Sequence, residues 1–197
     1  APGPGGRGSA VESVHLKAKD EVALEGSFYK PAAAQSPAVL LIHDAGSSRA
    51  QLDPLADRLN KQGFAVLTLD LRGHGASKSA TLDWDKLSDD DKKSTWSSAA
   101  QDVDAAASWI LTQTNVRSTS LSLVGYGAGC ALAVRHAKGD ENVVCMALLA
   151  PNAADYGIDV RSDIQTLAGL PTYVVTSKDH EGERMAQEAN ASSGNPY

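Results

Sequence analysis

Five short, continuous apolar runs are the feature of this sequence that most restricts its fold. They are AVLLIHD (38–44), AVLTLD (65–70), SLSLVG (120–125), VVCMALLA (143–150) and TYVVTS (172–177). Runs that are apolar at almost every position are typical of strands buried on both faces, which belong to parallel sheets. Segments with the i, i+3, i+4, i+7 spacing of amphipathic helices lie between them. The alternation predicts a doubly wound, mostly parallel α/β sheet with helices on both faces.

The start of the chain has a different pattern, in which apolar and polar residues alternate on either side of Asp20-Glu21. This pattern predicts an antiparallel hairpin with one face in water. We expect strands at 11–18, 22–29, 38–43, 65–70, 120–125, 143–150 and 172–176, with 120–125 at the centre of the sheet. We expect helices at 51–62, 99–112, 128–138 and 182–191.

Length and composition predict one domain and exclude several classes of protein. The chain has 197 residues, which we divide into a tail at 1–9 and a single domain at 10–197. The net charge of −6 argues against a nucleic-acid binder. No apolar run reaches the ~20 residues of a membrane span. The two cysteines, Cys130 and Cys145, are too few for a disulfide framework and are expected to be small buried side chains.

The ends of the chain leave alternatives open. The tail APGPGGRGS follows no initiator Met, which favours either an exported protein whose signal peptide has been removed or a linker from a longer chain. The polar connection at 76–98 carries Trp84 and Trp96. Its length favours either a lid over a site or a solvated insertion anchored by its two Trp side chains.

Three motifs follow successive strands at the edge where ligands of such sheets gather. They are HDAG (43–46), DLRGHG (70–75) and GYGAG (125–129). In this order they resemble the α/β-hydrolase superfamily, with closest similarity to small dienelactone-hydrolase-like or esterase-like members. HDAG is similar to the oxyanion-loop motif HGxG, and GYGAG stands at the nucleophile elbow G-x-S-x-G. The resemblance extends from about Val11 to the end of the chain.

The resemblance places a serine nucleophile where this chain has Gly127. Glycine has no side chain with which to attack a carbonyl carbon. Cys130 is expected inside a helix, and Ser47 and Ser48 lie on the oxyanion loop, so none of them replaces the serine. We expect Gly127 to retain the sharp turn, with a positive φ, because glycine adopts such dihedrals without strain.

The resemblance also implies an acid and a histidine near the end of the chain. The acid position falls at Asp179 or, one register further, at His180. The histidine follows one more strand, and the sequence ends at Tyr197 before it. We therefore expect the last strand and the catalytic histidine to be missing or to lie beyond residue 197. The open sheet edge would then be covered by a protein partner or by the missing segment.

The remaining part of the implied site is an oxyanion hole, which uses backbone amides. We expect the amides of Ala128 and of Asp44 or Ala45 to point into one small cavity that holds no substrate, only water or an anion. Of the other histidines, His15 is expected to be exposed and His136 to be structural, whereas His43 and His74 support loop geometry.

No metal or cofactor is expected. Several residues could approach the same rim, but their spacings match no known ligand pattern: His43, Asp44, Asp70, His74, Asp179 and His180. Nucleotide binding through GYGAGC is a weak alternative, since the motif lacks the fingerprint spacing and no acidic residue ends the next strand.

The sequence therefore predicts a non-catalytic protein of α/β-hydrolase fold with a binding or structural role. The alternative is a hydrolase of esters or lactones whose serine is replaced here and whose histidine lies beyond residue 197.

Overall fold

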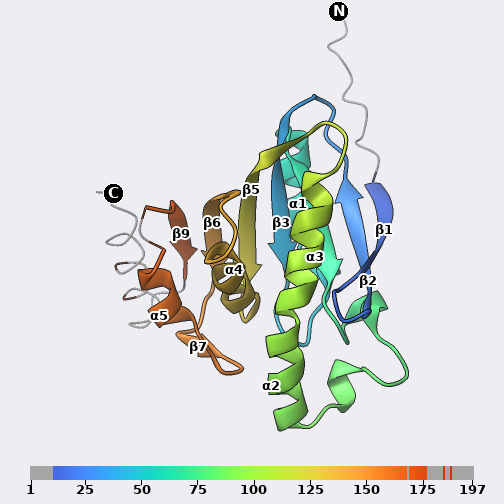
Figure 1. The fold of residues 1–197 in the computed structure, drawn as a ribbon, viewed down its shortest axis with the longest axis vertical. Helices are drawn as coiled ribbons and strands as arrows, with labels where there is room; N and C mark the ends of the chain where they lie inside the picture. The colour runs from blue at the N-terminus through green and yellow to red at the C-terminus, as the bar shows by residue number, and fades with distance from the viewer. Residues whose placement is uncertain (1–10, 168, 177–183, 185–186, 188–197) are drawn as a thin grey trace, which may run out of the picture.

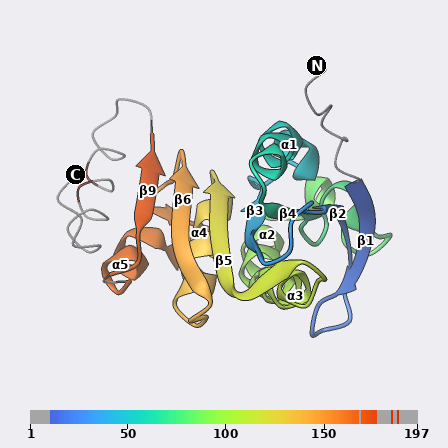
Figure 2. The ribbon, with the colours of Figure 1, turned by 90° about the horizontal axis from the view of Figure 1, so that it is seen from above.

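The computed structural model describes residues 11–167, 169–176, 184 and 187. In this part of the chain, seven strands form one sheet in the order β1-β2-β4-β3-β5-β6-β9 (Figures 1 and 2). Strand β2 is antiparallel to both β1 and β4, and the other neighbouring pairs are parallel. The bounds are β1 Val11–Lys17, β2 Ala23–Tyr29, β3 Ser36–Ile42, β4 Ala65–Asp70, β5 Val116–Tyr126, β6 Val143–Leu149 and β9 Thr172–Val175.

The apolar runs form these strands because both faces of the sheet are covered. In β3, Leu40 and Ile42 belong to a large buried cluster on one face, whereas Val39 and Leu41 belong to a second cluster on the other. All of these side chains are at most 3% exposed. Strand β5 lies between β3 and β6 in the interior of the sheet, as predicted.

Helices lie on both faces of the sheet, which confirms the predicted fold class. Helix α1 (Asp53–Lys61) packs with the second cluster through Ala56 and through its N-cap residue Leu52. Helices α3 (Ala100–Leu111) and α4 (Gly129–Ala137) pack with the first cluster. Viewed from above, α1 lies on one side of the sheet, and α3 and α5 (Val160–Gln165) lie on the other (Figure 2).

The connection at 76–98 contains structure that its polar sequence did not predict. It holds two short 3-10 turns, Gly75–Ser77 and Trp84–Lys86, and a helix, α2 (Asp89–Ser98). Ser88 caps α2 by accepting a hydrogen bond from the Asp91 amide. Trp84 and Trp96 are 5% and 0% exposed, so both side chains anchor the connection to the core.

Beyond β6 the sequence prediction was incomplete. A two-stranded hairpin, β7 (Ala154–Asp155) and β8 (Ile158–Asp159), leads into α5, and none of these elements was predicted. Strand β5 begins four residues before the predicted 120. The predicted helix at 182–191 falls outside the continuously described residues.

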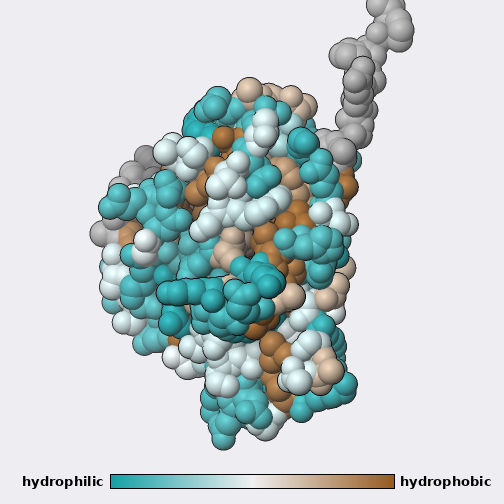
Figure 3. All heavy atoms as spheres, turned by 45° about the vertical axis from the view of Figure 1, so that its right-hand side comes forward, coloured by the Kyte–Doolittle hydropathy of each residue, from teal (hydrophilic) through white to brown (hydrophobic). Residues whose placement is uncertain are grey.

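The surface is mostly hydrophilic on the face shown in Figure 3, with hydrophobic atoms in smaller patches between polar ones. Within the described residues, no helix is both long enough and apolar enough to cross a bilayer.

One buried ion-pair network joins three parts of the fold. Arg72, in the loop after β4, donates from Nε and Nη2 to Asp102 of α3, and both of its Nη atoms donate to Asp20 in the β1–β2 turn. The Asp102 carboxylate also accepts from the Arg72 amide at 2.8 Å. The Arg72 and Asp102 side chains are 5% and 0% exposed, so neither charge has much access to water.

Removing one partner of this network is expected to cost much more than removing a surface charge. Asp102→Ala leaves the Arg72 guanidinium partly unpaired in the core and should lower the free energy of unfolding by about 3–5 kcal/mol. The control is Asp57→Ala, which breaks an exposed pair with Lys61 and should cost at most about 1 kcal/mol. Urea unfolding measures both values, and equal losses in the two variants would contradict the assignment.

Candidate functional site

The candidate site lies where the carboxyl ends of three neighbouring strands meet. Strand β3 pairs in parallel with both β4 and β5, so the loops that follow these strands open at the same edge of the sheet. The loops carry HDAG, DLRGHG and GYGAG, which brings together motifs that are distant in the sequence.

A sharp turn at Gly127 connects β5 to α4. Gly127 has φ +54°, in agreement with the prediction of a positive φ. Its amide donates to the Leu149 carbonyl at the end of β6, and its carbonyl accepts from the Cys130 amide. A Cβ on Gly129 would lie 2.5 Å from the Ile42 and His43 carbonyl oxygens. This close approach lets α4 begin directly against the end of β3.

The carboxylate of Asp44 lies over this turn. Its Oδ1 accepts hydrogen bonds from the amides of Ala45 and Ala128, both at 2.8 Å. The Asp44 amide instead donates a hydrogen bond to Oε1 of Gln51, at 3.3 Å. Of the expected donors, Ala45 and Ala128 therefore converge on one point, and an oxygen of the protein itself occupies that point.

His43 has both ring nitrogens engaged by the backbone. Its Nε2 lies 3.0 Å from the Leu71 amide, which can only donate, so Nε2 accepts. Its Nδ1 then carries the proton and donates to the Asp44 carbonyl at 2.7 Å. Burial lowers the pKa of His43 to about 4, although the hydrogen bond to the Asp44 carbonyl acts in the opposite direction and raises it. The neutral ring therefore holds the loops after β3 and β4 together.

The ring of His74 is held by the backbone in the same way as that of His43. Its Nε2 accepts from the Gly46 amide at 3.0 Å, and its Nδ1 donates to the Arg72 carbonyl at 2.9 Å. Burial lowers its pKa as well. The ring stacks at 4.5 Å on Trp84, which in turn contacts Trp96 and Tyr156. Both histidines thus support loop geometry, as the sequence analysis expected.

The other nucleophile candidates are not free to act at the turn. Cys130 is fully buried, and burial raises the pKa of its thiol to about 12. The reactive form of cysteine is the thiolate, so this thiol is inert near neutral pH. Ser47 and Ser48 line a separate cavity of about 360 Å³ beside His74 and Trp84.

A second carboxylate lies on the β7–β8 hairpin near the turn. Burial raises the pKa of Asp155, the hydrogen bond from Asn152 opposes this rise, and the negative charge of Asp44 adds to it. The hairpin also carries Tyr156, a non-glycine residue with φ +46° whose ring packs on Trp84 and Trp96. This segment was not predicted at the site, because strands of two residues carry no periodicity and a Tyr-Gly pair is not one of the common hairpin-turn pairs.

Other predicted site residues lie elsewhere. Asp179 and His180 lie outside the described residues, so their role as the acid position remains a prediction. His15 is 75% exposed and pairs with Glu25, as expected. Asp70 accepts from the amide and guanidinium of Arg49. Among the described residues, no three His, Cys, Asp or Glu side chains are grouped so that they could hold a metal ion.

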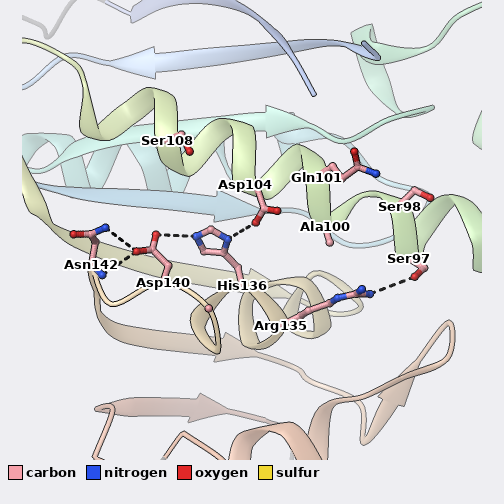
Figure 4. Close-up of a pocket in the computed structure, with 11 residues that line it drawn as sticks. Ser97, Ser98, Ala100, Gln101, Asp104, Ser108, Arg135, His136, Asp140 and Asn142 are labelled. Atoms are coloured by element: carbon pink, nitrogen blue, oxygen red, sulfur yellow. Dashed lines mark hydrogen bonds and ion pairs between the residues drawn. The ribbon is translucent and has the colours of Figure 1, made fainter. Parts of the chain in front are cut away.

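A polar cleft of about 840 Å³ opens between α3 and α4, at the opposite end of α4 from Gly127 (Figure 4). His136 lies in it between two carboxylates, with Nδ1 at 2.7 Å from Asp104 and Nε2 at 3.2 Å from Asp140. Arg135 donates to Ser97 across the cleft. The His136–Asp104 contact ties the end of α4 to α3, and the Arg135–Ser97 bond ties it to α2, which fits the structural role expected for His136.

Sequence comparison agrees with this geometry. A family model described as serine aminopeptidase, S33, matches residues 33–178, which include all three motifs. The chain belongs to this S33 family of α/β-hydrolases. A search of curated proteins found no significant match to the sequence.

Solved structures show the same fold. The esterase Pf2001 of Pyrococcus furiosus superposes with a TM-score of 0.73 at 17% identity, covering 95% of this S33 chain and 78% of the esterase. The α/β hydrolase GrgF from a Penicillium species gives 0.61 at 22% identity and 72% coverage of this chain. DcsB, in complex with its substrate analogue, gives 0.62 at 21% identity and 74% coverage. The S33 chain spans 46% of the length of GrgF and of DcsB.

The feature of this S33 site that the sequence analysis missed is the position of the Asp44 side chain. The signal was present, because HDAG has an aspartate where the HGxG motif has glycine. A glycine there has no side chain to enter the turn, whereas an aspartate brings a carboxylate within reach of the amides.

The low pKa of His43 predicts a pH dependence of stability. The fold lowers this pKa from 6.5 to about 4. Because the folded protein favours neutral His43, its contribution to the free energy of unfolding is complete above pH 6.5 and is lost as the pH falls toward 4. The linked loss is about 3 kcal/mol at most. In His43→Gln the free energy of unfolding should decline less over this range than in the unmodified protein, as measured by urea unfolding at several pH values. Equal slopes for the two proteins would contradict the assignment.

Proposed function

We propose that this S33-family protein is a non-catalytic α/β-hydrolase that acts by binding or by structural association. The observation that carries the proposal is Gly127. The elbow turn has kept its geometry, with φ +54°, but it presents no hydroxyl or thiol. Acyl transfer needs a nucleophile, a base and oxyanion donors, and the first of these has no side chain here.

The state of the histidines supports the same proposal. Each ring nitrogen of His43 and His74 is engaged by a backbone amide or carbonyl. Neither ring can take a proton from a nucleophile without losing one of these bonds. Their lowered pKa values further disfavour the imidazolium that a general base becomes.

A binding role is supported by the exposed end of the sheet. Strand β9 is the last strand of the described sheet, and it presents Tyr173 and Val175, which are 64% and 58% exposed. We propose that a protein partner or a further segment of the chain covers this edge, since an uncovered apolar edge strand promotes aggregation.

Membership of the S33 family favours a second candidate, the hydrolysis of esters or lactones. This reaction would need a bound water in place of the serine and a histidine from beyond residue 197. The two candidates differ in a measurable quantity, which is turnover by the unmodified chain.

We expect no hydrolysis of p-nitrophenyl acetate above the buffer rate. In enzymes that lack the nucleophile and the base, the residual acceleration comes from substrate binding and the oxyanion donors. Here both donors, the Ala45 and Ala128 amides, are already bonded to Asp44, so they are not available to a substrate. Gly127→Ser alone should not create activity, because a serine without a base remains protonated and weakly nucleophilic.

The control for this assay is a longer version of the chain that continues past Tyr197, with and without Gly127→Ser. Saturable hydrolysis by the unmodified 197-residue chain would refute the non-catalytic proposal. Activity confined to the longer Gly127→Ser version would identify a hydrolase scaffold that has lost two parts.

A further inference from the structure

Helix α4 has no capping side chain of its own. Its N-cap residue is Ala128, which makes no side-chain capping hydrogen bond. The first amides of a helix need acceptors, and the helix dipole favours a negative charge beside them. Asp44, which is 84 positions earlier in the sequence, supplies both through the 2.8 Å bond from the Ala128 amide to Oδ1.

The same oxygen is held by a second, independent donor. The Ala45 amide lies 2.8 Å from Oδ1, so two backbone donors from separate segments converge on one carboxylate oxygen. Convergent amides of this kind stabilise an oxyanion in acyl-transfer enzymes. In this chain the anion is covalently part of the protein.

The carboxylate also fills the space that a side chain at residue 127 would need. An ideal Cβ on Gly127 would lie 2.3 Å from Asp44 Oδ1, 2.4 Å from Cγ and 2.8 Å from Oδ2. Real Cβ atoms essentially never come this close to another atom, so something must shift to admit one. The Asp44 carboxylate therefore cannot stay in its present position while residue 127 carries a side chain.

We propose that the Asp44 carboxylate is the resident ligand of the anion site formed by the Ala45 and Ala128 amides, and that Asp44 and Gly127 form a matched pair that keeps this site closed. This inference rests on the proposed non-catalytic function, because it assigns an occupant to the site that a catalytic relative would leave open for substrate. A small free carboxylate is the closest match to the group that the two amides already hold.

The first test removes the carboxylate and adds it back. Asp44→Ala should lower Tm by about 1–8 °C, the range expected for loss of a helix cap in a domain of this size. Formate is the free equivalent of the group removed, so it should raise the Tm of Asp44→Ala more than sodium chloride does at equal ionic strength. The unmodified protein should respond equally to the two salts.

Two matched variants show whether the effect belongs to this site. Asp44→Asn keeps an acceptor oxygen in place and should gain nothing from formate. Asp159→Ala removes an aspartate that caps α5 by accepting from the Ser162 amide. Because Asp159 is exposed to solvent, water replaces it, and formate should again have no specific effect.

The second test measures the coupling of Asp44 with Gly127. Gly127→Ser should lower Tm more in the unmodified background than in Asp44→Ala, where the space for the new side chain has been opened. The Asp155 pKa, followed by NMR titration, should fall in both Asp44→Ala and Asp44→Asn because the Asp44 charge contributes to its rise.

Additive Tm losses in the cycle of Asp44→Ala with Gly127→Ser, or equal responses of Asp44→Ala to formate and chloride, would overturn the proposal. If Asp44→Ala does not fold, the cycle is measured with Asp44→Ser, which also opens space and keeps an acceptor oxygen, and Gly127→Ser must be less damaging there than in the unmodified protein. Asp44→Asn is the steric control, because its amide is as large as the carboxylate and opens no space. None of these measurements depends on turnover, so ester hydrolysis by the unmodified chain would refute the proposed function separately.

Discussion

The pair of hydrogen bonds from the Ala45 and Ala128 amides to one oxygen of Asp44 determines what this edge of the sheet can do. Strands β3 and β5 are neighbours and parallel, so the loop after β3 lies directly beside the N-terminus of α4. An acidic side chain in that loop finds two amides and a helix dipole within reach. Bonds to a charged acceptor are worth roughly 1.5–3 kcal/mol each, which is a substantial fraction of the ~5–15 kcal/mol by which a domain is stable. The loop after β3 therefore occupies the anion site at the Gly127 turn with its own Asp44 side chain.

The fold was predictable because strands that are buried on both faces of a sheet have apolar residues at almost every position. Continuous apolar runs such as 38–42 and 65–69 contribute to both clusters. Amphipathic spacing marked α1 and α3, and a nearly all-apolar segment that ends at Gly139 marked α4. Helix α2 was missed because it is polar on all sides except for Trp96, so its stability comes from the Ser88 cap, three acidic residues in the first turn and one buried ring. The β7–β8 hairpin was missed because strands of two residues carry no periodicity.

The site was predictable in its backbone but not in its side chains. Glycine spacing marked the turn at Gly127, and the position of HDAG after β3 brought the Ala45 amide to the same edge. Where the Asp44 carboxylate lies depends on the distance between two loops that are 84 positions apart, and no local pattern encodes that distance. The roles of His43 and His74 were predictable only as support for the loops. Their tautomers follow from backbone amides that the fold itself brings to the rings.

The geometry also restricts the order in which residues 44 and 127 can be substituted. A serine at 127 needs its Cβ where the Asp44 carboxylate now lies, so Asp44 cannot occupy its present position while the elbow carries a side chain. A glycine at 127 followed by an aspartate at 44 meets no such steric barrier. The glycine removes side-chain atoms and relieves the energetic cost of a positive φ. With Gly127 in place and no acid at 44, the two amides would have no acceptor from the protein, and a carboxylate there supplies one. A glycine at 127 thus makes room for the Asp44 carboxylate, and the carboxylate in its present position then makes a side chain at 127 costly unless residue 44 changes with it.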